Sequence, residues 1–334
     1  MSAAPMPAVG VSVFRAGELL AEQVTGIADL STGRPAGADD WWDLASLTKV
    51  LVTLPEVLAL ADRSRLRLDE PLATCWPRAE GRPVGALSAA DLLSHRAGLP
   101  ASVEFFRSMS GPAEIVDAAL TLPAGRADAV YSDVGFILLG ALVQDLTGTP
   151  LPTLAERRSG LRMGRAPGPA VATERCPWRG RLIVGEVHDE NAAAMGGAAG
   201  HAGGFGTLRL VTAAAQAWLG DRVVSAEAHR SARRCWSTDR AGGRFGLGWW
   251  LTPTRGLGGP VAGPGGYGCS GFVGNRVWLE PEHGYGVVIL SNRIHPVRGD
   301  RGPFAAWCDD LLTAVAYAIR RSTDAGGAAV VLPP

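Results

Sequence analysis

The stretch WWDLASLTKVLVTLPEVLAL, residues 41–60, holds a serine and a lysine whose spacing suits nucleophilic chemistry. Lys49 is the one lysine among 32 basic residues, and it follows Ser46 by three positions. In a helix these two side chains would be neighbours on the first turn. Burial lowers the pKa of an amine and lets it accept a hydroxyl proton, whereas the pKa of arginine stays above about 12. The pair therefore predicts a serine nucleophile with a lysine base.

A bland explanation of the same pair stays open. Ser-x-x-Lys is a short pattern, and a surface lysine one turn after a serine N-cap would produce it without any chemistry. The apolar residues that follow recur at helical spacing, which predicts a half-buried helix beginning near Ser46. They are Leu47, Val50, Leu51, Leu54, Val57, Leu58 and Ala61. Pro55 is expected to kink this helix, because its ring removes a backbone donor.

Composition sets the class of protein. The 334 residues are 47% hydrophobic and 19% charged, which is typical of a globular chain long enough for a substantial core. The formal net charge is zero, so no global attraction to nucleic acid or to an anionic membrane is expected. We therefore expect neither nucleic acid nor a membrane as a partner.

Cysteine usage and the N-terminus bear on the compartment. The five cysteines are widely spaced and contain no CxxC pair, which argues against a disulfide framework and a zinc site. The opening MSAAPMPAVGVSVFRAG lacks a basic segment followed by an apolar one, and no apolar run approaches the roughly 20 residues that cross a bilayer. The expected localisation is cytoplasmic.

Strand patterns lie at both ends of the chain. Residues 8–28 alternate like two strands turned at Arg15-Ala16-Gly17, and residues 275–291 look like a second hairpin turned at Glu282-His283-Gly284. A closing helix then places Phe304, Cys308, Leu311, Leu312, Val315 and Ile319 on one face. We predict a single catalytic unit over residues 1–334. Its sheet-forming parts are about 8–45 and 260–325, and a helical insertion spans about 50–250.

Five segments carry a family resemblance. They are WDLASLTK (42–49), RLRLDEPL (65–72), LSAADLLSHRAGLP (87–100), YSDVGFILLGALVQDLTGTPL (131–151) and GHAGGFGT (200–207). In this order and spacing they resemble the serine β-lactamase and penicillin-binding-protein superfamily, in its class C-like and esterase-like branch. The resemblance implies an α/β (α+β) fold of the β-lactamase/DD-peptidase type, with an antiparallel sheet from both chain ends flanked by helices.

The resemblance also implies roles for three residues. Ser46 would form an acyl-enzyme, and Lys49 would remove its proton during attack. Tyr131 occupies the place of the family's active-site tyrosine and would pass a proton to the leaving group. A structural alternative for Tyr131 is a core aromatic, because the residues after it continue as an amphipathic helix.

Two positions depart from the family pattern. Asp133 stands where many relatives have asparagine, and an ionised carboxylate accepts hydrogen bonds but cannot donate one to a substrate carbonyl. This departure favours an ester over a β-lactam or a peptide amide. Asp133 could also pair with Lys49, which would raise the pKa of the amine and oppose its role as a base.

The second departure lies at Cys269-Ser270-Gly271, where relatives carry Lys or His, then Thr or Ser, then Gly. The backbone N–H of Phe272 would still form an oxyanion hole with that of Ser46, because it needs no particular side chain. Without a cation at Cys269, recognition of a substrate carboxylate should weaken. Cys269 is interpreted as a small buried residue in preference to a second nucleophile.

The segment 174–207 resembles a loop that borders the site in esterase-like relatives. His188 is a candidate substrate contact within it, although a satisfied loop residue is the simpler interpretation. GPGGYG (263–268) fits GxGxxG, but a strand-like run follows it, which argues against a dinucleotide site. No metal or organic cofactor is expected.

These expectations converge on acyl transfer through a Ser46 acyl-enzyme. The substrate would be a small-molecule ester or amide as acyl donor, with water or a small amine or alcohol as acceptor, and a step in secondary metabolism is one conceivable setting. The alternative is a catalytically inactive, β-lactamase-like protein that binds a ligand in the same pocket.

Overall fold

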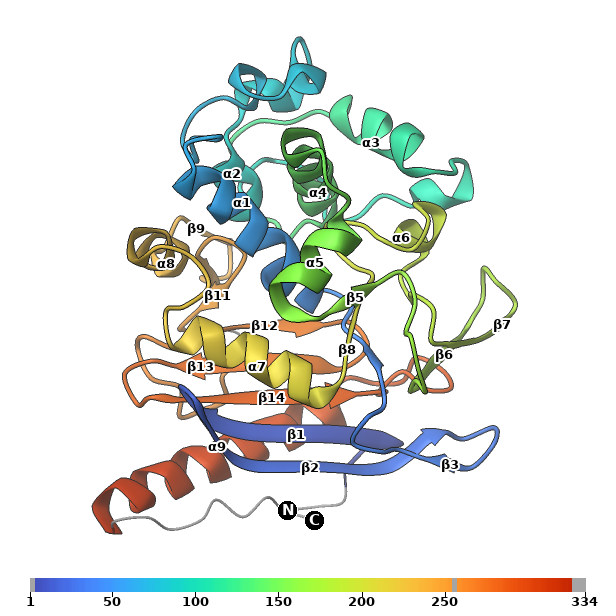
Figure 1. The fold of residues 1–334 in the computed structure, drawn as a ribbon, viewed down its shortest axis with the longest axis vertical. Coiled ribbons are helices and arrows are strands. Elements are labelled where there is room, and N and C mark those ends of the chain that lie inside the picture. Colours follow the sequence, from blue (N-terminus) through green and yellow to red (C-terminus); the bar gives the residue numbers. More distant parts are fainter. Residues whose placement is uncertain (1–3, 254–256, 326–334) are drawn as a thin grey trace.

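A nine-stranded antiparallel sheet forms the base of the molecule in the computed structural model, which describes residues 4–253 and 257–325 (Figure 1). Its strands run in the order β3-β2-β1-β14-β13-β12-β11-β10-β9. Their bounds, in that order, are Arg34–Pro35, Glu18–Asp29, Ala8–Arg15, Tyr285–Ser291, Asn275–Glu280, Tyr267–Gly271, Trp250–Leu251, Arg244–Phe245 and Ser237–Thr238. Strands from the two chain ends meet where β1 pairs with β14, Val9 opposite Ser291 and Arg15 opposite Tyr285. The predicted antiparallel sheet from both ends of the chain is confirmed.

Helices cover both faces of this sheet. On one face lies α9 (Gly302–Ala325), and on the other α7 (Leu208–Leu219) crosses β1 and β14 (Figure 1). Successive residues of β1 alternate between the two faces, so that Val11 and Val13 pack toward α9 while Phe14 packs on the opposite side. The apolar stripe predicted for the closing helix is buried in the same cluster as Val11 and Val13.

The remaining helices form a second layer above α7 (Figure 1). They are α1 (Leu54–Asp62), α2 (Ala89–Leu93), α3 (Pro112–Leu120), α4 (Asp133–Thr147), α5 (Leu151–Ser159), α6 (Glu190–Ala194) and α8 (Ala226–Arg233), with 3-10 turns at Leu72–Thr74, Pro77–Ala79, Pro83–Ala86 and Phe105–Arg107. Helix α4 is almost fully buried, because Val134, Ile137, Leu138 and Ala141 pack into the main core. This burial makes α4 the central helix of the layer.

The predicted division of the chain was wrong in two details. Strands β9, β10 and β11 belong to the large sheet although they lie inside the span expected to be a helical insertion, about 50–250. Strand β4 (Trp42–Asp43) joins a separate sheet with β8 (Gly204–Gly206) and β5 (Arg162–Met163). Each of these strands has only two or three residues, which is too short for an alternating pattern to be read.

The helix that carries the candidate nucleophile starts irregularly. After a turn at Ser46 the chain forms a π-helical segment, Lys49–Thr53, and then continues as α1, with Pro55 in its first turn. A π-helical turn widens the helix, and such turns occur often at functional sites. Lys49 therefore stands at the first residue of an irregular, buried segment.

One further hairpin, β6 (Ala172–Cys176) and β7 (Arg181–Val184), projects beside α6 (Figure 1). As for membrane crossing, the described part of the chain contains no single helix of sufficient length and apolarity, although α4 and α5, bent by 85° at their junction, match a span when taken together.

Candidate active site

Ser46 lies in the tight turn that leads from β4 into the helix. Ala45, just before it, has φ 46°, a left-handed conformation that is uncommon for a residue with a Cβ. The turn is held because the Ala45 N–H donates to Asp43 Oδ1 at 2.7 Å. Backbone strain of this kind persists only where the surroundings enforce it, and it often accompanies functional sites.

Lys49 is fully buried and points its amine at Ser46. Its Nζ donates to Ser46 Oγ at 2.8 Å and to the carbonyl oxygen of His201 at 3.1 Å. Its Nζ also lies 2.7 Å from Oδ1 of Asp133, the first residue of α4. The Ser46 and His201 oxygens thus accept hydrogen bonds from the ammonium group, and Asp133 supplies its counter-charge.

The proton state of Lys49 differs from the sequence expectation. Burial acts to lower the pKa of Lys49, as predicted, but the Asp133 carboxylate and smaller contributions from Tyr131 outweigh it and raise the pKa above its ordinary value. The expectation of an amine made neutral by burial was therefore wrong for the resting protein. The 2.7 Å pair with Asp133 instead favours the alternative effect, a rise in the pKa of Lys49.

Tyr131 is stacked on Trp250 and packs against the tilted ring of His95, beside the amine. Its ring centroid lies 4.5 Å from that of His95, 5.9 Å from that of Trp250 and 5.0 Å from the Nζ of Lys49. Its hydroxyl is buried and has no hydrogen-bond partner among the described residues. Burial raises the pKa of Tyr131, although Lys49 acts in the opposite direction, so the phenol keeps its proton. A protonated hydroxyl in this place could donate to a bound substrate.

Strand β12 brings the predicted third element against Ser46. The Cys269 thiol donates to the Ser46 carbonyl oxygen at 3.8 Å and is fully buried. Burial raises the pKa of Cys269 to about 11. A thiol of this kind is protonated at neutral pH and offers neither a cation nor an attacking thiolate.

The end of β12 lies close to the turn that carries Ser46. Gly271 packs so closely on the preceding turn that a Cβ added to it would lie 2.7 Å from the carbonyl oxygen of Leu44. Phe272 is the residue after Gly271. The backbone N–H groups of Ser46 and Phe272 donate no hydrogen bond to any described residue. Two unused N–H groups on adjoining segments can stabilise an oxyanion.

Ser270 faces the other side of the sheet. It lies opposite Arg276 in the β12–β13 ladder, and Arg276 lies over the ring of Phe304 in α9. Ser270 and Gly271 line a cavity of about 290 Å³ together with Arg293 and Phe304. Of the predicted substrate-binding residues, Ser270 and Gly271 therefore line a cavity on the side of α9.

His188 is buried between Glu174 and Phe272. Its Nε2 lies 2.8 Å from Oε1 of Glu174, and its ring stacks on the exposed ring of Phe272 with 5.5 Å between centroids. The structure thus places Ser46, Lys49, Tyr131, Asp133, Cys269, Gly271 and Phe272 together, with His188 behind Phe272.

Sequence reasoning missed three contributors. The His201 carbonyl oxygen accepts from Lys49, while Glu174 and Arg298 meet around His188. Two of them had a signal, because His201 lies in the segment GHAGGFGT that carries the family resemblance and Glu174 opens the segment 174–207 that resembles a loop bordering the site. Arg298 comes from a distant segment without any local pattern.

Comparison with known proteins shows the family and the fold of the chain. The model of the family described as Beta-lactamase matches residues 1–307. N-acetylmuramyl-L-alanine amidase of Bacillus subtilis (strain 168) is 26% identical, over 76% of this chain and 68% of the relative. A putative D-alanyl-D-alanine carboxypeptidase of Escherichia coli (strain K12) is 28% identical, over 76% of this chain and 69% of the relative. The class C beta lactamase from Rhodobacter sphaeroides superposes with a TM-score of 0.72 at 19% identity, covering 94% of this chain and 95% of that one.

Proposed function

The chain belongs to the beta-lactamase family, whose members are serine hydrolases, and from this premise we propose that it acts through a Ser46 acyl-enzyme. The observation that carries the proposal is the 2.8 Å hydrogen bond from Lys49 Nζ to Ser46 Oγ inside a buried site. The substrate is a small-molecule acyl donor, an ester or an amide. The acceptor is water or a small amine or alcohol.

In the proposed acylation, Ser46 Oγ attacks the substrate carbonyl carbon. The bond from Oγ to carbon forms, the O–H bond breaks, and the proton passes to Nζ of a neutral Lys49. Negative charge on the carbonyl oxygen is stabilised by the N–H groups of Ser46 and Phe272. Because Asp133 raises the pKa of Lys49, only a small fraction of the protein has the neutral amine at neutral pH.

Collapse of the tetrahedral intermediate then needs a proton for the leaving group. Tyr131 supplies this proton in our proposal, because burial keeps its phenol protonated. Its hydroxyl also has no hydrogen bond to a described residue that would have to break first. A water, amine or alcohol next attacks the acyl-enzyme and loses its proton to the Tyr131 phenolate. The bond from Ser46 Oγ to the acyl carbon then breaks, and the Lys49 ammonium returns its proton to Ser46 Oγ. The products are the free acid or a transferred acyl group, together with regenerated Ser46.

The two departures from the family pattern, at Asp133 and Cys269, support an ester as the acyl donor. The part of that ester that lies near Cys269 would be uncharged. Asp133 forms an ion pair with Lys49 and has no N–H to offer a peptide or β-lactam carbonyl. Cys269 carries no charge, since its pKa is raised to about 11. All five cysteines are free, which supports our further proposal of a reducing, cytoplasmic setting, as a tailoring step in secondary metabolism would have.

Intact mass after incubation with an activated acyl ester tests the proposal. We expect a stable adduct on the wild-type protein that is absent from Ser46→Ala. A wild-type protein without an adduct after hours of incubation would instead support the second candidate, an inactive ligand-binding protein, which the charged Lys49–Asp133 pair favours. Adding small amines during turnover then separates hydrolysis from acyl transfer, by the ratio of acyl-amide to free acid.

A further inference from the structure

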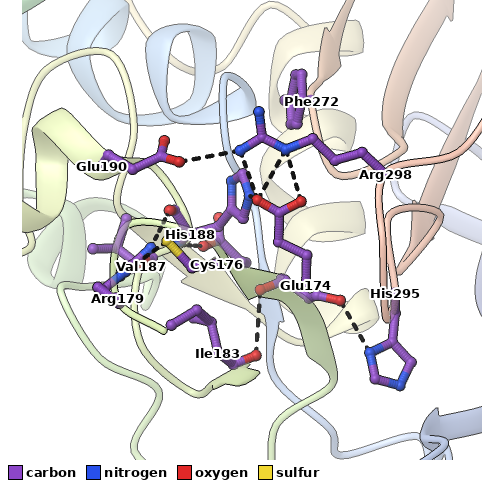
Figure 2. Close-up of polar contacts among 12 residues, drawn as sticks. Glu174, Cys176, Arg179, Ile183, Val187, His188, Glu190, Phe272, His295 and Arg298 are labelled. Carbon is purple, nitrogen blue, oxygen red and sulfur yellow. Dashed lines mark hydrogen bonds and ion pairs between the residues drawn. The ribbon is translucent and has the colours of Figure 1, made fainter. Parts of the chain in front are cut away.

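A buried carboxylate near the site has no part in the chemistry proposed above. Glu174 in β6 is 2% exposed and accepts hydrogen bonds from Arg298, at 2.9 and 2.7 Å from Nε and at 2.6 Å from Nη2 (Figure 2). Its Oε1 also lies 2.8 Å from His188 Nε2. Burial acts to raise the pKa of Glu174, but the contacts with His188 and Arg298 prevail and lower it to about 2. Such a charge is costly to bury unless it is paired, so an arrangement of this kind calls for an explanation.

The same two partners of Glu174 hold the ring of Phe272. The His188 ring is stacked on it with 15° between the planes, and the Arg298 guanidinium lies 4.9 Å from its centroid (Figure 2). Arg293 Nη2 donates to the Phe272 carbonyl oxygen at 2.9 Å. Phe272 is 38% exposed and lies just beyond β12, yet both its ring and its carbonyl group are restrained.

His188 reaches the nucleophile turn as well. Its backbone N–H donates to Asp43 Oδ2 at 2.6 Å, and Asp43 Oδ1 accepts from Ala45, the residue before Ser46. Arg179 donates to the carbonyl oxygens of Val187 and His188, which fixes this segment from the hairpin side (Figure 2). His188 is therefore in contact with both segments that carry the two unused N–H groups.

We propose that Glu174, held by Arg298, is a positioning residue that orients His188 and thereby aims the Phe272 N–H at the developing oxyanion. This inference rests on the proposed function. The carboxylate fixes the plane of the imidazole, the imidazole fixes the stacked ring of Phe272, and that ring fixes the peptide at the end of β12. An oxyanion donor gives its full effect only when it is aligned before the charge develops.

The test compares acylation of Ser46 by an activated ester and by its thionoester, in which sulfur replaces the carbonyl oxygen. Sulfur is the larger atom and the weaker acceptor, so the ratio of the ester rate to the thionoester rate reports the alignment of the oxyanion donors. We expect Glu174→Gln to lower this ratio at least about tenfold. This loss is smaller than the effect of removing a whole donor. Arg181→Gln, which breaks an exposed ion pair with Glu186 on the same hairpin, is the matched control and should keep the wild-type ratio.

The outcomes are distinct. If Glu174 only stabilised the hairpin, its replacement would reduce the amount of folded protein and leave the ratio unchanged. An unchanged ratio in folded Glu174→Gln therefore overturns the inference. If that variant does not fold, Arg298→Lys, at a half-exposed position, takes its place under the same criterion. Wild-type protein that neither substrate acylates would refute the proposed function itself, and the inference with it.

Discussion

The Nζ of Lys49 lies 2.7 Å from Oδ1 of Asp133, and this pairing determines which protons the site holds at rest. The carboxylate outweighs the effect of burial and keeps the amine charged. A charged amine donates to Ser46 Oγ and cannot take its proton. Activity should therefore depend on the small neutral fraction of Lys49, which grows as the pH rises.

Replacement of Asp133 by asparagine tests this dependence on pH. Below the pKa of Lys49, the acylation rate of the wild-type protein should rise about tenfold for each pH unit, because the neutral amine is the base. Asp133→Asn removes the negative charge that raises the pKa of Lys49, while the burial that lowers this pKa remains. The pKa of Lys49 therefore falls. Removal of one close opposite charge should move the profile at least about 1 unit toward acid. Stopped-flow acylation with a chromogenic ester between pH 6 and 10 measures the shift, and superimposable profiles would show that Asp133 does not control the base.

Substitutions of Lys49 separate the need for a base from the need for a positive charge. Lys49→Ala should slow acylation of Ser46 by about 100-fold or more, the usual contribution of a general base. Lys49→Arg should not restore the rate, because a guanidinium keeps its proton. Arg67→Ala, at an exposed position, is the control and should react as the wild type does. Wild-type rates in Lys49→Arg would mean that a cation alone is sufficient.

The substitution Cys269→Ala tests whether the thiol that stands in β12, where relatives carry Lys or His, has a role in catalysis. The thiol has a pKa of about 11 and serves as neither base nor nucleophile at neutral pH, so acylation of Ser46 should stay within about threefold of the wild-type rate. Cys308→Ala, at a buried thiol of α9, controls for the cost of an emptied site in the core. Complete loss of labelling in Cys269→Ala alone would assign the thiol a role in catalysis.

Much of the fold followed from local patterns. Residues 8–28 and 275–291 follow a period of two because successive side chains of a strand point to opposite faces of the sheet, and the stripe of α9 follows from its single buried face. The strands β9–β11 were not predictable, because two residues contain no period. Local spacing thus succeeds where an element is long and packed in one direction.

The same reasoning explains what was found in the site and what was missed. Ser46 and Lys49 lie one helical turn apart, so sequence spacing alone brings them together. The proton state of Lys49 depends on Asp133, which only the packing of α4 against the π-helical segment brings within 2.7 Å. Glu174 and Arg298 are separated by 124 positions, and no local pattern marks a contact of that kind.

Gly271 provides the sharpest test of the predicted oxyanion hole. A Cβ at this position would lie 2.7 Å from the carbonyl oxygen of Leu44, which is too close, so Gly271→Ala must push β12 away from the turn that carries Ser46. The N–H of Phe272 would then move off the site, and acylation should fall by about 10²–10³, the effect of losing one oxyanion donor. Gly299→Ala is the matched control, because its added Cβ would have no neighbour within 4 Å. Equal Tm values for the two variants, together with a slow reaction in Gly271→Ala alone, would assign the loss to the site. Acylation of Gly271→Ala at the wild-type rate would show that the Phe272 N–H does not stabilise the oxyanion.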